Sequence, residues 1–302
     1  MAAFYPNPIY LTPSSSPRST SGEPTKPTLL AFHGSGSNGT IHTVQLARLT
    51  RHLKTHFNII SCEAPFPSPA GPGVLPFFEG CGPFKRWVPP SDRVTTESMK
   101  AGLASSLMPP LVETLVRNTV SKVRSQGGRV VGLIGFSQGT RVVAGLLKGC
   151  EIRRAVEAAT ASKASGEGGQ AEGEGLDWLD FAFGLSVCGS YPPPLVPSSA
   201  RSLLSQPLSQ SPSFNQQTLS AIETQKIQSP TLHIQGKQDE FEWAGKLLIE
   251  TAYEVAEGKS DVLELQMGHH YPVLAEESEK ICDWVVETWR RCCEAETQTQ
   301  KR

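Results

Sequence analysis

A pentapeptide directly after a strongly apolar run is the feature that most constrains the fold of this 302-residue chain. Residues 130–134, Val-Val-Gly-Leu-Ile, have the apolar and β-branched character of a buried parallel strand. Residues 135–139, Gly-Phe-Ser-Gln-Gly, follow at once, and residues 140–148 have the apolar side of a packed helix. A strand that passes through G-x-S-x-G into a helix holds the serine in a strained turn with its hydroxyl exposed. We therefore predict that Ser137 is a nucleophile in an α/β fold.

A serine nucleophile needs a general base, and the base needs an orienting acid. Residues 231–235 predict a strand, and Asp239 follows it closely. Because parallel strands end at the same edge of a sheet, we predict that Asp239 lies near Ser137 and orients the base. Asp239 could instead cap the helix that starts near Phe241, in which case Glu240 is the alternative acid.

The base is expected in the last part of the chain. Residues 262–267 alternate like another strand and lead into residues 268–272, Gly-His-His-Tyr-Pro. A loop at this position can bring an imidazole over Ser137. The spacing alone leaves His269 and His270 open as the base.

Three segments together resemble the fungal FSH-type serine hydrolases: residues 30–34, Leu-Ala-Phe-His-Gly, residues 135–139 and residues 268–272. Residues 75–80, Leu-Pro-Phe-Phe-Glu-Gly, followed by Trp87, are also similar to a stretch of that family, so the resemblance covers most of residues 28–289. It implies an α/β-hydrolase fold with a mostly parallel central sheet, helices on both faces and a loop-rich lid region.

The resemblance also implies which residues act. In the family the catalytic histidine follows a glycine directly and precedes a proline by three positions, which selects His269 and supports Ser137 and Asp239. Met267 stands where a second glycine is usual, which affects the expected geometry of the turn. The family includes esterases and thioesterases that release polyketide acyl chains from their synthases, so this function and an acyl-carrier partner are expected.

An acyl-transfer enzyme must stabilise an oxyanion, which α/β-hydrolases do with two backbone N–H groups. These map to Ser35, after the first expected strand, and to Gln138, after the nucleophile. His33 is expected to hold the same loop by hydrogen bonds. The aromatic side chains of the proline-rich segment 64–92 are interpreted either as packing or as a substrate pocket made by Phe77, Phe78 and Trp87.

Two functions from other classes remain open. Residues 34–39, Gly-Ser-Gly-Ser-Asn-Gly, match the dinucleotide-binding pattern G-x-G-x-x-G, and Glu63 follows the next expected strand, where a ribose-binding acid would lie. The chain would then be a dinucleotide-binding oxidoreductase. Alternatively, a hydrolase fold could serve as a non-catalytic binding module, because a fold does not by itself imply a function.

The composition limits the partners. A formal net charge of −1 gives no attraction for nucleic acid, which we exclude as the main partner. Seven scattered cysteines show no zinc-ligand spacing and no disulfide framework, so neither a metal nor another cofactor is expected. Residues 1–27 lack the pattern of a secretory signal, and no apolar run reaches the length of a membrane span. A cytoplasmic enzyme that acts on a small ester or thioester is expected.

The chain is expected to hold a single α/β-hydrolase domain over residues 28–290. The Pro/Ser/Thr-rich segment 1–27 is predicted to be partly disordered, and the acidic, glycine-rich insert 162–175 is predicted to be disordered. Residues 189–225 are a possible lid, a final helix is expected over about 276–289, and residues 291–302 are expected to fray.

Overall fold

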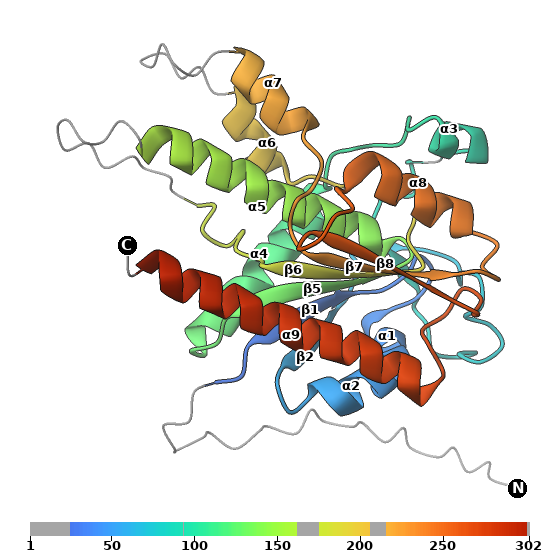
Figure 1. Ribbon diagram of the computed structural model, residues 1–302. Helices are drawn as coiled ribbons and strands as arrows, with labels where there is room; N and C mark the ends of the chain where they lie inside the picture. The colour runs from blue at the N-terminus through green and yellow to red at the C-terminus, as the bar shows by residue number, and fades with distance from the viewer. Residues whose placement is uncertain (1–24, 93, 162–174, 206–215, 301–302) are drawn as a thin grey trace, which may run out of the picture.

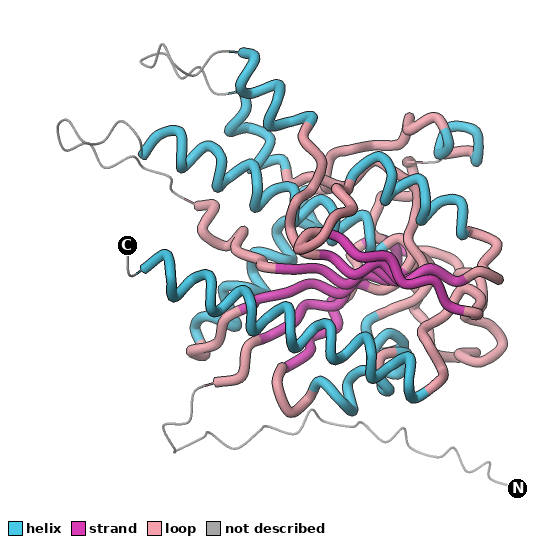
Figure 2. Tube along the Cα trace, viewed as in Figure 1, coloured by secondary structure: helices cyan, strands magenta, loops and turns pink. Residues whose placement is uncertain are grey.

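The computed structural model describes residues 25–92, 94–161, 175–205 and 216–300 (Figure 1). Nearly all of segment 1–27, predicted to be partly disordered, and of the insert 162–175, predicted to be disordered, lies outside these residues. The strands form a central layer between helices (Figure 2).

The central layer is a six-stranded sheet in the order β2-β1-β5-β6-β7-β8. Each neighbouring pair of its strands is parallel. The strands are β1 (Thr28–Phe32), β2 (Asn58–Cys62), β5 (Val130–Phe136), β6 (Phe183–Val187), β7 (Thr231–Gly236) and β8 (Ser260–Leu265). A separate antiparallel pair joins β3 (Phe66–Pro67) to β4 (Lys85–Arg86). The mostly parallel sheet predicted from the sequence is confirmed.

The strand order reverses between β1 and β5. From β1 the chain moves outward to β2, and from β5 it moves in the opposite direction through β6, β7 and β8. Such a switch point opens a crevice beyond the carboxyl ends of the two strands. The loops after β1 and β5, which carry Ser35 and Ser137, therefore lie next to each other.

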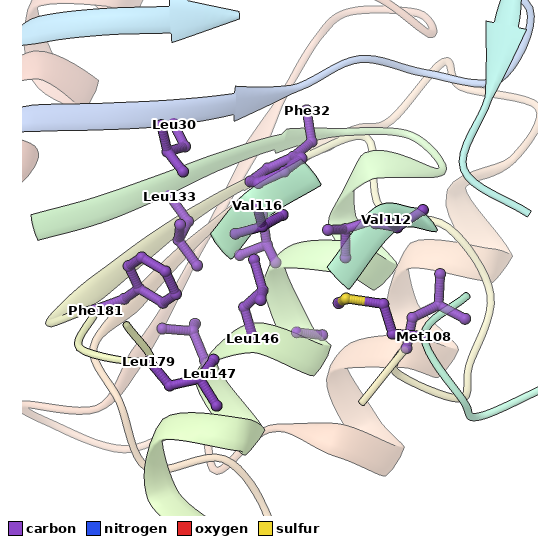
Figure 3. Close-up of a cluster of buried hydrophobic side chains, with 14 of the residues drawn as sticks. Leu30, Phe32, Met108, Val112, Val116, Leu133, Leu146, Leu147, Leu179 and Phe181 are labelled. Carbon is purple, nitrogen blue, oxygen red and sulfur yellow. The ribbon is translucent and has the colours of Figure 1, made fainter. Parts of the chain in front are cut away.

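Alternate side chains of the strands point to opposite faces of the sheet, and helices cover both faces. The helices are α1 (Gly39–Gln45), α2 (Ala47–Leu53), α3 (Thr96–Lys100), α4 (Pro110–Ser125), α5 (Gly139–Ala161), α6 (Ser198–Ser205), α7 (Gln216–Thr224), α8 (Glu242–Ala252) and α9 (Ala275–Gln300). Leu30 and Phe32 of β1 pack with buried residues of α4 and α5 on one face (Figure 3). Leu29 and Ala31 pack with α2 and α9 on the other. Helices on both faces confirm the α/β-hydrolase class that the resemblance implies.

Two helical segments differ from the prediction. Helix α9 continues to Gln300, through most of the tail that was expected to fray. Arg290 pairs with Glu287 and Glu294 along this helix, and Glu296 pairs with Arg129 next to β5, so local and tertiary contacts extend the helix beyond residue 290. In the segment 189–225, α6 and α7 lie against α5. Among the described residues of this segment, only Gly189, Ser190 and Tyr191, at its start, line the cavity described below.

Candidate active site

Ser137 occupies the strained turn that the pentapeptide predicts. Its φ angle is +48°, a left-handed conformation that costs a non-glycine residue about 1–2 kcal/mol. The Ser137 N–H donates to the Val187 carbonyl at 3.0 Å, and the Thr140 hydroxyl donates to the Ser137 carbonyl at 2.7 Å. The contacts of the neighbouring strand and helix thus hold the strained backbone in place.

The glycine after the nucleophile is required by close packing. A Cβ at Gly139 would lie 2.1 Å from the Phe32 carbonyl oxygen, and a Cβ at Gly135 would lie 2.8 Å from the backbone of Thr140. Only glycine lets α5 begin this close to β1. The two glycines of the pentapeptide therefore bring the elbow directly against the loop that carries Ser35.

Asp239 makes both of the contacts considered for it in the sequence analysis, one with the base and one at the start of the following helix. Its Oδ2 lies 2.8 Å from His269 Nδ1, and its Oδ1 accepts the Phe241 N–H at 2.8 Å. One carboxylate oxygen therefore holds the imidazole while the other holds the turn before α8. Glu240, the alternative acid, is exposed.

The electrostatics keep Asp239 ionised. Burial acts to raise the pKa of Asp239, whose side chain is 1% exposed, but the hydrogen bond and charge of His269 and the Phe241 N–H outweigh burial. The pKa of Asp239 is therefore lowered from its ordinary value. An ionised Asp239 accepts the Nδ1–H of His269 and leaves the Nε2 lone pair of His269 available as a base.

The two adjacent histidines have different surroundings. His269 contacts Asp239, and its ring lies between Phe136 and Phe241, with both centroids 5.1 Å away. The His270 ring bonds only to neighbouring backbone within the described chain: its Nδ1–H donates to the Tyr271 carbonyl, and its Nε2 accepts the Gly268 N–H. The geometry favours His269 as the base, the choice that the resemblance implied.

Cys188 lies behind this pair. Its thiol is 3.7 Å from the Gly268 carbonyl and 3.6 Å from the His270 carbonyl, the two carbonyls that flank His269. The donor atoms of Cys188, Asp239 and His269 all lie within 4.8 Å of one another, a grouping that could hold a metal ion. Asp239 and His269 already bind each other, and the orienting hydrogen bond accounts for their geometry without an ion.

A cavity of about 580 Å³ opens above these residues. Ser35, Ser137, Gln138 and His269 all contribute to its wall, so the structure brings the predicted nucleophile, base and oxyanion residues to one site. The apolar part of the wall, which the sequence prediction missed, consists of Val74, Val94, Met99, Phe136, Tyr191, Phe241, Trp243 and Ala244. Phe241 and Trp243 follow Asp239 closely in sequence, and their position after a strand end was the signal that could have found them.

The predicted pocket residues Phe77, Phe78 and Trp87 do not line this cavity, and that prediction is wrong. Phe77 is 84% exposed, whereas Trp87 is fully buried against Phe32. The Trp87 indole N–H donates to the His33 carbonyl at 2.7 Å, a bond that turns the ring toward the core. Trp87 therefore supports the loop that carries Ser35 from behind.

The backbone N–H groups of Ser35 and Gln138 make no hydrogen bond with any described residue. The Gln138 side chain accepts the Trp87 backbone N–H at 2.7 Å, which fixes the turn after the nucleophile. His33 Nδ1–H donates to the Gly34 carbonyl, and His33 Nε2 accepts the Ala64 N–H. Burial lowers the pKa of His33 to about 4, so the ring is neutral and holds the loop, as predicted.

The glycine-rich loop has internal contacts that do not suit a dinucleotide site. The Glu63 carboxylate accepts the Gly39 N–H at 2.6 Å at the start of α1. Asn38 caps the same helix through the Ile41 N–H and also donates to the Cys81 carbonyl. The expected ribose acid is thus engaged with the helix, and the loop faces the cavity of Ser137 instead.

Among the described residues, no helix is long and apolar enough to cross a membrane.

Comparisons with known proteins agree with this site. The chain is similar to the esterase FUS5 of Gibberella fujikuroi, with 28% identity over 88% of each chain. It is 31% identical to the esterase pigG of Monascus ruber over 82% of this chain and 85% of the relative. It is 25% identical to the thioesterase FSL2 of Gibberella zeae over 87% of this chain and 92% of the relative. The family model described as serine hydrolase (FSH1) matches residues 21–281. The chain therefore belongs to the FSH1 family of serine hydrolases.

Proposed function

We propose that Ser137 is the nucleophile, His269 the general base and Asp239 the orienting acid of this enzyme. As a serine hydrolase related to esterases and a thioesterase, the enzyme hydrolyses ester or thioester bonds. The observation that carries this assignment is which residues meet at one cavity wall. That wall includes both the strained Ser137 and His269, whose Nδ1 lies 2.8 Å from the buried carboxylate of Asp239.

The reaction then takes two steps, formation of an acyl-serine and its hydrolysis, and each is a nucleophilic attack on a carbonyl. His269 Nε2 removes the Ser137 proton as Oγ attacks the substrate carbonyl, and the backbone N–H groups of Ser35 and Gln138 bind the oxyanion. The imidazolium returns its proton to the departing alcohol or thiol, which leaves an acyl-serine. Water activated by His269 then attacks the acyl-serine, and the carboxylic acid and free Ser137 are released.

The native substrate in this proposal is an acyl chain bound as a thioester to a carrier protein, as in polyketide assembly. The resemblance to polyketide-releasing hydrolases supports this substrate, and so does the similarity to the thioesterase FSL2. A cytoplasmic location is proposed with it, on the ground that all seven cysteines are free thiols.

Labelling with a fluorophosphonate, followed by intact mass, tests the roles directly. The native protein is expected to gain one probe, Ser137→Ala to gain none, and His269→Ala to react at least a hundredfold more slowly. His270→Ala is the matched variant and is expected to keep labelling, because the His270 ring bonds only to neighbouring backbone within the described chain. A folded native protein that takes up no probe would instead support the non-catalytic binding module.

The carrier-bound substrate needs a separate assay. Purified enzyme is incubated with an acyl chain on a carrier protein and, in parallel, with the matching free aryl ester. Release from the carrier supports the proposal. Turnover of the free ester without release from any carrier would contradict the carrier-bound substrate while leaving the serine hydrolase mechanism intact.

A further inference from the structure

Three residues that line the cavity carry buried polar atoms without a partner among the described residues. Ser37 Oγ, Gln45 Oε1 and Arg86 Nε are each buried and make no hydrogen bond within the described chain. All three residues line the cavity of Ser137. Ser37 is only 3% exposed, so its hydroxyl is shielded from bulk solvent. A buried polar atom without a partner costs about 1–3 kcal/mol, which makes a cluster of them on one wall a sign of a polar ligand.

The backbone places Ser37 and Arg86 beside the proposed oxyanion site. The Gly36 N–H donates to the Lys85 carbonyl at 2.8 Å, and the Lys85 N–H donates to the Ser37 carbonyl at 2.7 Å. These bonds join the loop after Ser35 to the strand that carries Arg86. The residue after Arg86 donates its backbone N–H to the Gln138 side chain. Ser37 and Arg86 are therefore positioned by the same contacts that hold Ser35 and Gln138.

The charge of Arg86 is not neutralised by a neighbour. Arg86 forms no ion pair with any residue of the described ranges. Asp92 is the carboxylate on the cavity wall, and its charge acts on the buried Arg141. Arg141 in turn lies 4.5 Å from the centre of the Tyr191 ring. Within the described ranges, Asp92 forms no ion pair with Arg86.

We propose that Ser37, Gln45 and Arg86 form a subsite for an anionic oxygen group, a carboxylate or a phosphate, that the substrate carries. This inference rests on the proposed hydrolase function and adds a substrate class to it. Arginine suits this ligand because its planar fork of N–H donors matches the oxygens of a carboxylate or phosphate. The Ser37 hydroxyl supplies a further donor, and the Gln45 amide can present either NH₂ or oxygen. The apolar wall with Met99, Phe241 and Trp243 leaves room for the carbon chain.

Two matched substrate pairs test the subsite and locate the anion. The first pair, 4-nitrophenyl hydrogen glutarate and 4-nitrophenyl methyl glutarate, differs only by a carboxylate on the acyl part. The second pair, acetyl-4′-phosphopantetheine and acetyl-pantetheine, differs only by a phosphate on the leaving group. A charged hydrogen bond of the usual strength predicts about a tenfold or larger preference in kcat/KM for the anionic member of at least one pair. The pair that shows the preference identifies the part of the substrate that carries the anion.

The variants connect the preference to Arg86. In Arg86→Gln the ratio of kcat/KM values, anionic over neutral, is expected to fall to about one, and Arg86→Lys is expected to keep part of it. Lys85→Gln removes a neighbouring charge from the same strand and is expected to keep the native ratio, because Lys85 does not line the cavity. The native ratios alone also decide the matter if Arg86→Gln does not fold.

The experiments distinguish failure of the proposed subsite from failure of the hydrolase function. If fluorophosphonate labels Ser137 and the neutral ester is hydrolysed, but neither pair shows a preference in the native enzyme, the subsite is wrong and the hydrolase stands. A preference that survives in Arg86→Gln would also overturn the subsite. If the native protein neither takes up the probe nor hydrolyses any of the four substrates, the proposed function itself fails, and the subsite that rests on it fails with it.

Discussion

His269 Nδ1 lies 2.8 Å from Asp239 Oδ2, and the other Asp239 oxygen is held at 2.8 Å by the Phe241 N–H. Both carboxylate oxygens are therefore engaged, so the side chain has a fixed orientation toward the imidazole. A fixed acid selects the tautomer in which Nδ1 carries the proton and stabilises the imidazolium that forms during the reaction.

Asp239→Asn is expected to lower kcat about 10³- to 10⁴-fold with little change in KM, because an amide can turn its NH₂ group to His269 and favour the wrong tautomer. The change is nearly isosteric, so the thermal midpoint should move little. Steady-state hydrolysis of a 4-nitrophenyl ester measures the effect. Glu240→Gln is the control, since Glu240 is exposed, and a large loss in that variant would make Glu240 the orienting acid.

Gly36 supports the oxyanion loop by close packing. It has a φ of +74°, and a Cβ there would lie 2.1 Å from the Gly71 backbone nitrogen. Gly36→Ala must displace the loop that carries Ser35, so we expect a loss of stability above the roughly 1–2 kcal/mol of left-handed strain alone and at least a tenfold lower kcat. Urea unfolding and ester hydrolysis measure the two effects.

Gly80 offers a matched comparison for Gly36. Its φ is +77°, but apart from its two chain neighbours no atom of the described residues lies within 4 Å of the position where a Cβ would be. Gly80→Ala should therefore show the backbone strain alone, with activity close to native. Equal losses of stability and activity in the two variants would show that crowding at Gly36 does not shape the oxyanion loop.

Cys188 lies close enough to His269 and Asp239 to be considered as a nucleophile in place of Ser137. Burial raises the pKa of the Cys188 thiol, so the reactive thiolate is scarce, and Cys188 does not line the cavity. We therefore expect iodoacetamide at neutral pH to leave esterase activity intact while it alkylates the exposed Cys81. Intact mass followed by peptide mapping identifies the modified thiols. Inactivation that tracks alkylation of Cys188 would contradict Ser137 as the nucleophile.

The sequence was sufficient to predict that Ser137, Asp239 and the histidine pair lie at one edge of the sheet. Each of them follows a recognisable strand, and parallel strands end at the same edge. The sequence could not separate His269 from His270, since both are on the same short loop. That choice came from the family resemblance. In the structure the difference is a tertiary contact, the bond of His269 to Asp239, which no local pattern encodes.

The cavity wall shows a second limit of sequence reasoning. Phe77 and Trp87 are both aromatic residues of one irregular loop, and nothing local indicates that Trp87 turns inward to bond the His33 carbonyl while Phe77 faces solvent. Arg86 was overlooked because its place beside Ser37 depends on pairing between segments almost fifty residues apart, through the bridge of Ser37 with Lys85.

His233 makes the stability of the protein depend on pH. The ring is buried in β7 against Tyr253, both nitrogens lack partners in the part of the chain that the structure describes, and burial lowers the pKa of His233 to about 3. The unfolded chain takes up this proton near the ordinary value of 6.5, whereas the folded protein does so only near 3. The stability contributed by the neutral ring is therefore complete above about pH 6.5 and is lost as the pH falls toward 3, with a slope of at most about 1.4 kcal/mol per pH unit.

His233→Leu should remove this contribution to the slope without creating an unpaired polar group. We expect the free energy of unfolding in urea to fall less between pH 7 and pH 5 in His233→Leu than in the native protein. At pH 7 the variant should be at least as stable as the native protein, because the buried imidazole nitrogens that it replaces have no partner among the described residues and are costly to bury. His56→Leu, at an exposed position, is the control and should keep the native slope. An unchanged slope in His233→Leu would mean that His233 is protonated to the same extent in the folded and unfolded states.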